Sequence, residues 1–105
     1  MITVFISQTM NGKTEEEILK ERQAAVDMVK GLLDKYFDNL AVQVIDSYFK
    51  NTVFVKPLSC LAQSLELMAH ADLVVFAPGW ENDRRCKIEH ECAIQYGIKT
   101  LHLGD

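Results

Sequence analysis

The sequence has no long apolar segment, few cysteines and no low-complexity stretch. No part of it approaches the ~20 consecutive apolar residues that a membrane-spanning helix needs. The N-terminal segment lacks the positive flank of a signal peptide and resembles a strand. Its three cysteines, an odd number, do not make a disulfide framework and are typical of a reducing cytosol. Because repeats and linkers are also missing from its 105 residues, we expect one cytoplasmic domain spanning residues 1–105.

The charge balance excludes further classes of partner. The formal net charge is -4, which argues against a general affinity for nucleic-acid polymers or anionic membranes. A single nucleoside or nucleotide bound through a local site remains compatible with this charge. The motifs GxxxxGK[ST] and GxGxxG are both missing, so nucleoside triphosphates and dinucleotides are poorly supported and we expect no cofactor.

Strand-like and helix-like segments alternate along the chain. Apolar runs at residues 2–6, 40–45, 73–77 and 100–103 predict strands. Helices are predicted from the capping box of Thr14 and Glu17, from Pro57, and over residues 85–97. Residues 49–56 fit either an ordered loop or a short extra strand. This βαβαβαβ order predicts an α/β fold, a flavodoxin-like or Rossmann-like three-layer sandwich with a four-stranded parallel sheet in the order 2-1-3-4 and helices on both faces.

Helical spacing predicts which side of each helix packs on the sheet. The first helix has a stripe of Ile18, Arg22, Ala25, Val29, Leu32 and Tyr36. The second has one of Leu58, Leu61, Ala62, Leu65, Met68 and Ala69. Arg22 is the one charged residue in these stripes, so it needs a partner or an anion.

Glu89 is the most informative residue of the chain. In the predicted third helix it lies in the middle of the side formed by Cys86, Ile88, Cys92, Ala93 and Tyr96. A carboxylate buried among apolar groups has a raised pKa unless it is paired, and perturbed carboxylates in clefts are candidate catalysts. The alternative is a structural glutamate paired with Arg84, Arg85 or Arg22, because structural ion pairs perturb pKa values too.

The predicted topology brings polar loops to Glu89. Ligands of such sheets bind beyond the carboxyl ends of the strands, where the strand order reverses, which is here between the first and third strands. Three segments, residues 7–12, 46–48 and 78–83, converge at this point. Their polar side chains, with Glu89, are Ser7, Gln8, Asn11, Asp46, Tyr48, Glu81, Asn82 and Asp83.

Other motifs carry weaker signals. Cys86 and His90 are four residues apart, but no second Cys/His pair accompanies them, so we expect no metal site. Cys92 fits a buried structural thiol better than a nucleophile. Trp80 suits either stacking on a base or anchoring its loop. His70 and His102 have no evident partners in the sequence.

Several of these segments together resemble a known group of proteins. They are residues 4–12, residues 71–76, the pair Gly79-Trp80, and the spacing of Glu89, Ala93 and Gly97. The chain resembles, over nearly its whole length, a small phage and bacterial family of unknown function. That family is similar to nucleoside 2-deoxyribosyltransferases and nucleoside-monophosphate N-glycosidases.

The resemblance implies a reaction and a set of site residues. Glu89 matches the nucleophile that attacks the anomeric carbon and releases the base, with Asp83 and Asp46 ranked first as its acid or base partners. The implied function is cleavage or transfer of the N-glycosidic bond of a (deoxy)nucleoside or nucleoside monophosphate. The implied substrate-binding residues are Ser7, Gln8, Met10, Asn11, Gly12, Gly79, Trp80, Asn82 and Arg85.

The chain also departs from this pattern. Arg85 stands where the small family usually has glycine, and Glu91 where the enzymes have a hallmark glycine. The alternative interpretation is therefore a catalytically inactive nucleotide-binding or accessory protein of phage origin. A four-stranded sheet with open edges predicts a homo-oligomer, a dimer or larger, in which a neighbouring subunit can complete the site.

Overall fold

A computed structural model describes residues 1–10, 12–37, 41–47 and 56–104 of the chain. Strands and helices alternate in the predicted order. The elements are β1 (Ile2–Ser7), α1 (Glu15–Tyr36), β2 (Val42–Val44), α2 (Pro57–Met68), β3 (Leu73–Phe76), the short 3₁₀ helix η2 (Trp80–Asn82), α3 (Arg84–Gln95) and β4 (Lys99–His102). The question of a loop or an extra strand at 49–56 falls on residues of which all but Lys56 lie outside the described ones.

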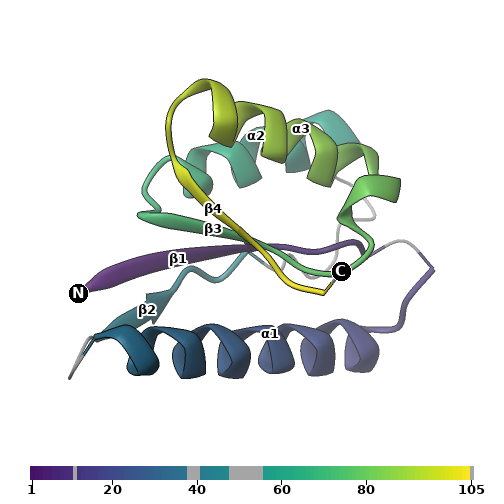
Figure 1. Cartoon of the computed structure of the whole chain (residues 1–105). Coiled ribbons are helices and arrows are strands. Elements are labelled where there is room, and N and C mark those ends of the chain that lie inside the picture. Colours follow the sequence, from purple (N-terminus) through teal and green to yellow (C-terminus); the bar gives the residue numbers. More distant parts are fainter. Residues whose placement is uncertain (11, 38–40, 48–55, 105) are drawn as a thin grey trace.

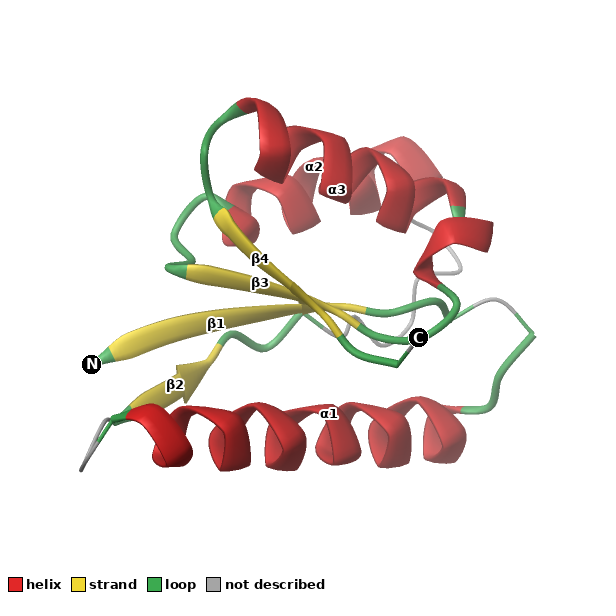
Figure 2. Ribbon diagram, in the orientation of Figure 1, coloured by secondary structure: helices red, strands yellow, loops and turns green. Residues whose placement is uncertain are grey.

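The four strands form one parallel sheet in the order β2-β1-β3-β4, which confirms the predicted fold class. Helix α1 covers one face of the sheet, and α2 and α3 cover the other (Figure 1). Figure 2 shows the same three layers by type of element. In the register of β1 and β3, Ser7 lies opposite Phe76, so both strands end at the same edge. This edge, where the strand order reverses, is the point at which ligands bind in such folds.

Local sequence signals account for the starts of the helices. At α1, Thr14 accepts a hydrogen bond from the Glu17 backbone and the Glu17 side chain bonds back, as the predicted capping box requires. Pro57 opens α2, where its missing N–H removes no helical hydrogen bond. At α3 the cap is Asp83, whose carboxylate accepts from the backbone N–H of Cys86.

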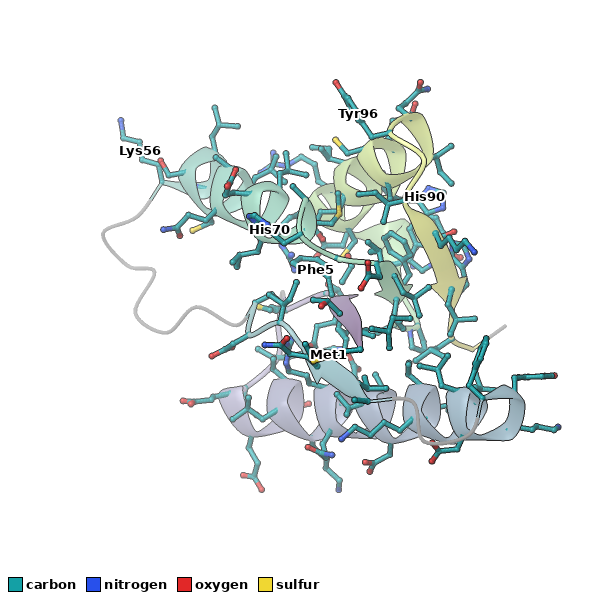
Figure 3. The ribbon with its side chains drawn as sticks, turned by 90° about the vertical axis from the view of Figure 1, so that its left-hand side faces the viewer. Met1, Phe5, Lys56, His70, His90 and Tyr96 are labelled. Carbon is teal, nitrogen blue, oxygen red and sulfur yellow. The ribbon has the colours of Figure 1, made fainter. Side chains whose placement is uncertain are left out.

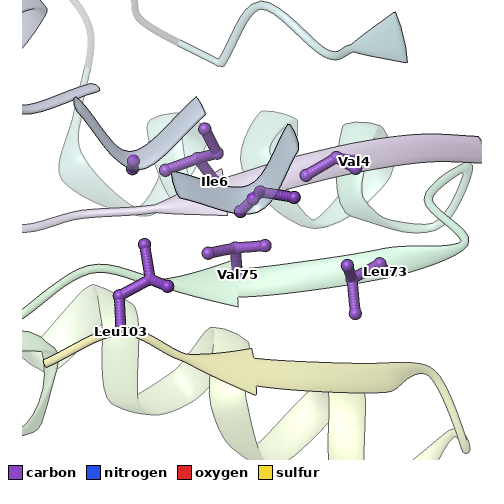
Figure 4. Packing of buried hydrophobic residues seen from close by; sticks show 7 residues of the cluster. Val4, Ile6, Leu73, Val75 and Leu103 are labelled. Atoms are coloured by element: carbon purple, nitrogen blue, oxygen red, sulfur yellow. The ribbon is translucent and has the colours of Figure 1, made fainter. Parts of the chain in front are cut away.

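Alternation along the strands separates the core into two layers. Between the sheet and α1, a cluster of Val4, Ile6, Ala25, Val29, Leu73, Val75 and Leu103 is buried (Figure 4). On the opposite face, Phe5, Met68, Val74, Phe76 and Ala93 pack under α2 and α3. Successive side chains of a strand point to opposite faces, so Ser7 shares the α3 side with Phe5. The same period that fills the core therefore directs the Ser7 hydroxyl towards α3.

The predicted helix stripes are wrong in part, chiefly at their ends. In α1, Ile18, Ala25 and Val29 are buried as predicted, but Leu32 and Tyr36 are exposed. The reason is length: 22 helical residues extend about 33 Å, whereas the six residues of β1 extend about 20 Å. In α2, Leu58 in the first turn is 75% exposed and Met68 at the opposite end is buried, but Ala62 in the middle of the helix and Ala69 just after it are exposed as well. Helix residues that extend beyond the ends of the strands have no sheet to pack on, and helical spacing alone does not indicate where the sheet ends.

Candidate active site

Ser7 and Glu89 meet at the carboxyl edge of the sheet. Ser7 is the last residue of β1, and Glu89 lies near the middle of α3. The Ser7 hydroxyl donates to Glu89 Oε1 across 2.6 Å. Both residues are fully buried, with an exposed fraction of 0%. The prediction that Glu89 is buried at the centre of its helix face is confirmed.

Arg85 binds the second oxygen of the same carboxylate. Its Nη1 lies 2.9 Å from Glu89 Oε2, one helical turn away, and its Nη2 donates to the backbone carbonyl of Gln8. The Arg85 side chain retains 22% exposure while that of Glu89 has none. Of the partners considered from the sequence, Arg85 is therefore the arginine that pairs with Glu89. The guanidinium ties α3 to the loop that follows β1.

Burial and hydrogen-bonded pairing change the pKa of Glu89 in opposite directions. Burial raises its pKa above the ordinary value of 4.5, and this effect outweighs the lowering by Arg85 and by the hydroxyls of Ser7 and Ser64. For Arg85, burial lowers the pKa, but the charges of Glu89, Cys86 and Asp83 raise it overall, so the guanidinium stays charged. A carboxylate with a raised pKa, fixed by hydroxyl and guanidinium donors, is equipped to attack an electrophile or to carry a proton.

Asp83 caps the N-terminus of α3. Its Oδ1 accepts from the Cys86 backbone N–H at 3.1 Å, and its Oδ2 accepts from the Thr9 hydroxyl at 2.7 Å. Burial raises its pKa, but these hydrogen bonds and the Arg85 charge lower it overall. Asp83 is consequently a carboxylate at neutral pH. It supplies negative charge beside Arg85 rather than a proton.

Asp46 follows β2 on the other side of β1. Its charge acts on Arg22, whose pKa burial lowers overall. Arg22 Nη1 donates to the Ser47 hydroxyl at 3.0 Å and its Nη2 to the carbonyl of Ile45. The predicted need of Arg22 for a partner is thus confirmed. The charge of Asp46 therefore acts on Arg22, whereas Asp83 caps α3.

Gln8 has a buried acceptor without a donor in the described part of the chain. Its Nε2 donates to the Ile18 carbonyl at 3.1 Å and to Glu21 Oε1 at 3.2 Å. Both are acceptors, so rotating the amide by 180° would bring oxygen against oxygen, and the orientation is determined. Its Oε1 is buried and has no hydrogen-bond partner among the described residues. A donor from water or from a ligand hydroxyl would satisfy it.

The remaining predicted substrate-binding residues lie in the loops of the same edge. Gly79 and Trp80 begin the turn after β3, where Gly79 has a φ of 90° that disfavours other residues. Asn82 is exposed in η2, Met10 is half-buried, and Gly12 is exposed with a φ of 74°. Asn11 lies outside the described residues.

The thiol of Cys86 is unsuited to nucleophilic chemistry. Burial raises its pKa to about 12, although a hydrogen bond with Ser7 and the Arg85 charge oppose the rise. It therefore stays protonated at neutral pH. Across residues 1–10, 12–37, 41–47 and 56–104, no group of three or more Cys, His, Asp or Glu side chains is arranged to hold a metal ion.

Trp80 packs in a cluster of rings at the end of the sheet. Its indole stacks on His90 with ring centroids 4.3 Å apart and an interplanar angle of 22°. It also contacts Phe76 at 5.2 Å and His102 at 5.3 Å. Trp80 thus anchors its loop to β3, α3 and β4. His102, for which the sequence offered no partner, belongs to this cluster.

Two features of the site differ from the sequence prediction. Ser64 of α2 was not recognised, yet it is 1% exposed and its hydroxyl helps to lower the pKa of Glu89. A serine among apolar residues at helical spacing was the available signal. The predicted face of α3 was wrong for Ile88, which is 36% exposed, and for Tyr96, which is 83% exposed. Ile88 is rotated about 100° from Glu89, and Tyr96 lies beyond the last residue of α3.

The fold and site define an α/β protein with a buried, arginine-paired carboxylate at the switch point of a parallel sheet. None of the helices in the described ranges combines the length and apolar character needed to cross a bilayer. Comparisons with protein families, characterised proteins and solved structures found no match to this chain.

Proposed function

We propose that this protein cleaves or transfers the N-glycosidic bond of a (deoxy)nucleoside or nucleoside monophosphate, with Glu89 as the nucleophile. The observation that carries the proposal is the Glu89 carboxylate at the reversal point of strand order, with its two oxygens bound separately by Ser7 and Arg85. Its raised pKa gives it a basicity suited to attack on carbon. The resemblance of Glu89, Ala93 and Gly97 to the nucleophile motif of the transferases adds the substrate class.

The reaction has two steps. One oxygen of Glu89 bonds to the anomeric carbon while the bond from that carbon to the base nitrogen breaks. The base leaves with the electron pair and takes up a proton from solvent. Water, or the nitrogen of a second base, then displaces Glu89 from the carbon and restores the carboxylate. Asp83, ionised at neutral pH, adds the negative charge that an oxocarbenium-like transition state requires.

The Arg85 side chain controls access to Glu89 in this proposal. Glu89 itself has no exposed surface, whereas Arg85 is partly exposed and occupies one carboxylate oxygen. Substrate therefore reaches Glu89 only when Arg85 turns outwards. In that position its guanidinium is available for a phosphate or hydroxyl of the substrate. Gln8 Oε1, which has no hydrogen-bond partner among the described residues, is an acceptor for a second hydroxyl.

The second candidate is a nucleotide-binding or accessory protein without turnover. The observation in its favour is the same ion pair: Glu89 is fully buried and both of its oxygens already have partners. If Arg85 never releases Glu89, ligand binds and no bond is cleaved. Stabilisation by ligand without product distinguishes this candidate from the enzyme.

The test is an incubation of the protein with deoxynucleosides and their 5′-monophosphates, with and without a free acceptor base. Chromatography measures released and exchanged base. The variant Glu89→Gln removes the nucleophile but keeps its size, and Glu91→Gln on the exposed side of α3 is the matched control. The enzyme proposal expects turnover in the wild type and in Glu91→Gln and none in Glu89→Gln. Equal turnover in all three proteins would refute it.

We also propose that the chain self-associates. Among the residues that the structure describes, β2 and β4 are the edge strands of the sheet, and edge strands offer backbone groups for pairing with another strand. A second copy that covers one edge would remove this liability and can complete the pocket around Glu89.

A further inference from the structure

Two of the three histidines of the chain lie against each other at the end of the sheet. His90 of α3 and His102 of β4 have their Nε2 atoms 3.0 Å apart. They are twelve residues apart in sequence and are brought together because α3 packs beside β4. His102 is exposed and His90 is half-buried, so solutes in the solvent reach the pair. The glycosidic reaction proposed for Glu89 uses neither ring.

Aromatic neighbours hold both imidazole rings in place. Trp80 stacks on His90 with centroids 4.3 Å apart at 22°, and Phe76 stacks on His102 at 5.3 Å and 18°. Phe76 is fully buried in the sheet and is paired in register with His102, which ties this ring to the core. Two donor nitrogens are thus positioned before any ligand arrives, which reduces the entropy lost on binding.

We propose that His90 and His102 form a two-histidine site for a divalent transition-metal ion of the Ni²⁺ or Cu²⁺ class. Imidazole nitrogen suits these ions and binds them at about 2.0–2.1 Å. Two nitrogens 3.0 Å apart at that bond length subtend about 94° at the ion. This is close to the right angle of tetragonal coordination, whereas a tetrahedral zinc ion needs nitrogens about 3.3 Å apart. Water fills the remaining positions.

The electrostatics of the pair agree with metal binding. Partial burial lowers the pKa of His90, and the nearby His102 lowers it further. The charge of Glu91 acts in the opposite direction and favours a cation at this point. In the free protein one Nε2 carries the proton that it shares with the other. On metal binding that proton moves through solvent to Nδ1 of the same ring, which frees the Nε2 lone pair for the ion.

The chain contains a fluorescent residue that reports on His90 and a third histidine that serves as a control. Trp80 is the only tryptophan, and it stacks directly on His90, so a paramagnetic ion bound there quenches its fluorescence. His70, the third histidine, lies at the end of α2, apart from His90 (Figure 3). Its side chain is 71% exposed and faces Glu66 at 3.6 Å. His70→Ala therefore removes a histidine without touching the pair.

The experiment is a titration of the purified protein with Ni²⁺, followed by Trp80 fluorescence. We expect saturable quenching with the same midpoint in the wild type and in His70→Ala, and a midpoint at least about tenfold higher in His102→Ala and His102→Gln. Saturating Ni²⁺ should raise the Tm of the first two proteins only. An unchanged midpoint in both His102 variants, or no saturable quenching in the wild type, would overturn the proposal. The readout does not depend on nucleoside turnover.

Discussion

Replacing Arg85 by methionine should make stability strongly dependent on pH. The change keeps an unbranched apolar stem but removes the guanidinium, and with it the charge that neutralises the fully buried Glu89. Removing one partner of a buried ion pair costs about 3–5 kcal/mol when the other stays charged. Protonation of Glu89 in the folded variant removes part of this cost. Protonation itself costs about 1.36 kcal/mol for each pH unit above the ordinary pKa of 4.5, and this limits how much can be recovered.

The cost of protonating Glu89 sets how much the stability of Arg85→Met changes with pH. At pH 7 protonation of Glu89 costs about 3.4 kcal/mol, and at pH 5 about 0.7 kcal/mol. Because the folded state has the higher pKa, it binds more protons than the unfolded state between the two pKa values. The free energy of unfolding of Arg85→Met should therefore fall as pH rises from 4.5 and level off above the folded pKa of Glu89. Arg85→Met/Glu89→Gln lacks the titrating group and should lack this fall.

The assay is urea unfolding of the wild type, both single variants and the double variant at pH 5, 6, 7 and 8. The difference in unfolding free energy between Arg85→Met/Glu89→Gln and Arg85→Met should grow by as much as about 2.7 kcal/mol from pH 5 to pH 7. A difference independent of pH would show that Glu89 is not a buried, titrating carboxylate. The reasoning about its raised pKa would then be refuted.

Two further predictions concern the α3 cap and the assembly. Urea unfolding at pH 7 should show that Asp83→Ala lowers the free energy of unfolding by about 1–2 kcal/mol, because the Cys86 N–H and the Thr9 hydroxyl lose their acceptor. Asp83→Asn still caps α3, so it should lower the free energy of unfolding by less than half of that amount. This Asp83 contribution should disappear as pH falls through the lowered pKa of the aspartate; equal losses in both variants would contradict the capping role. Light scattering after size exclusion should give at least twice the 11.9 kDa of one chain, and a monomer at high concentration would exclude self-association.

Local patterns were enough to predict the framework of the protein. Alternating apolar runs and helix starts predicted the parallel sheet, and right-handed crossovers left few topologies, among which the order 2-1-3-4 was chosen. Helical spacing also predicted that Glu89 faces the core, and that Arg22 needs a partner. These conclusions depend on residues close in sequence, or on rules that hold for whole folds.

Contacts between distant elements were not predictable in the same way. Ser64 of α2 acts on the carboxylate of Glu89 in α3, and no residue near Ser64 in the sequence indicates that the two are close. The pairing of His90 with His102 depends on the distance between α3 and β4. The choice of Arg85 over Arg84 or Arg22 as partner of Glu89 depends on side-chain direction at one helical turn. Each is a question of three-dimensional packing that spacing leaves open.

The most direct test of the central claim is base release from deoxynucleosides and their monophosphates by the wild type, Glu89→Gln and Glu91→Gln. If Glu89 is the nucleophile, the wild type and Glu91→Gln release or exchange base at similar rates. Glu89→Gln then falls to the uncatalysed rate while keeping its far-UV circular dichroism. Undiminished turnover in Glu89→Gln, or ligand-induced stabilisation of the wild type with no product from any substrate, would contradict the claim.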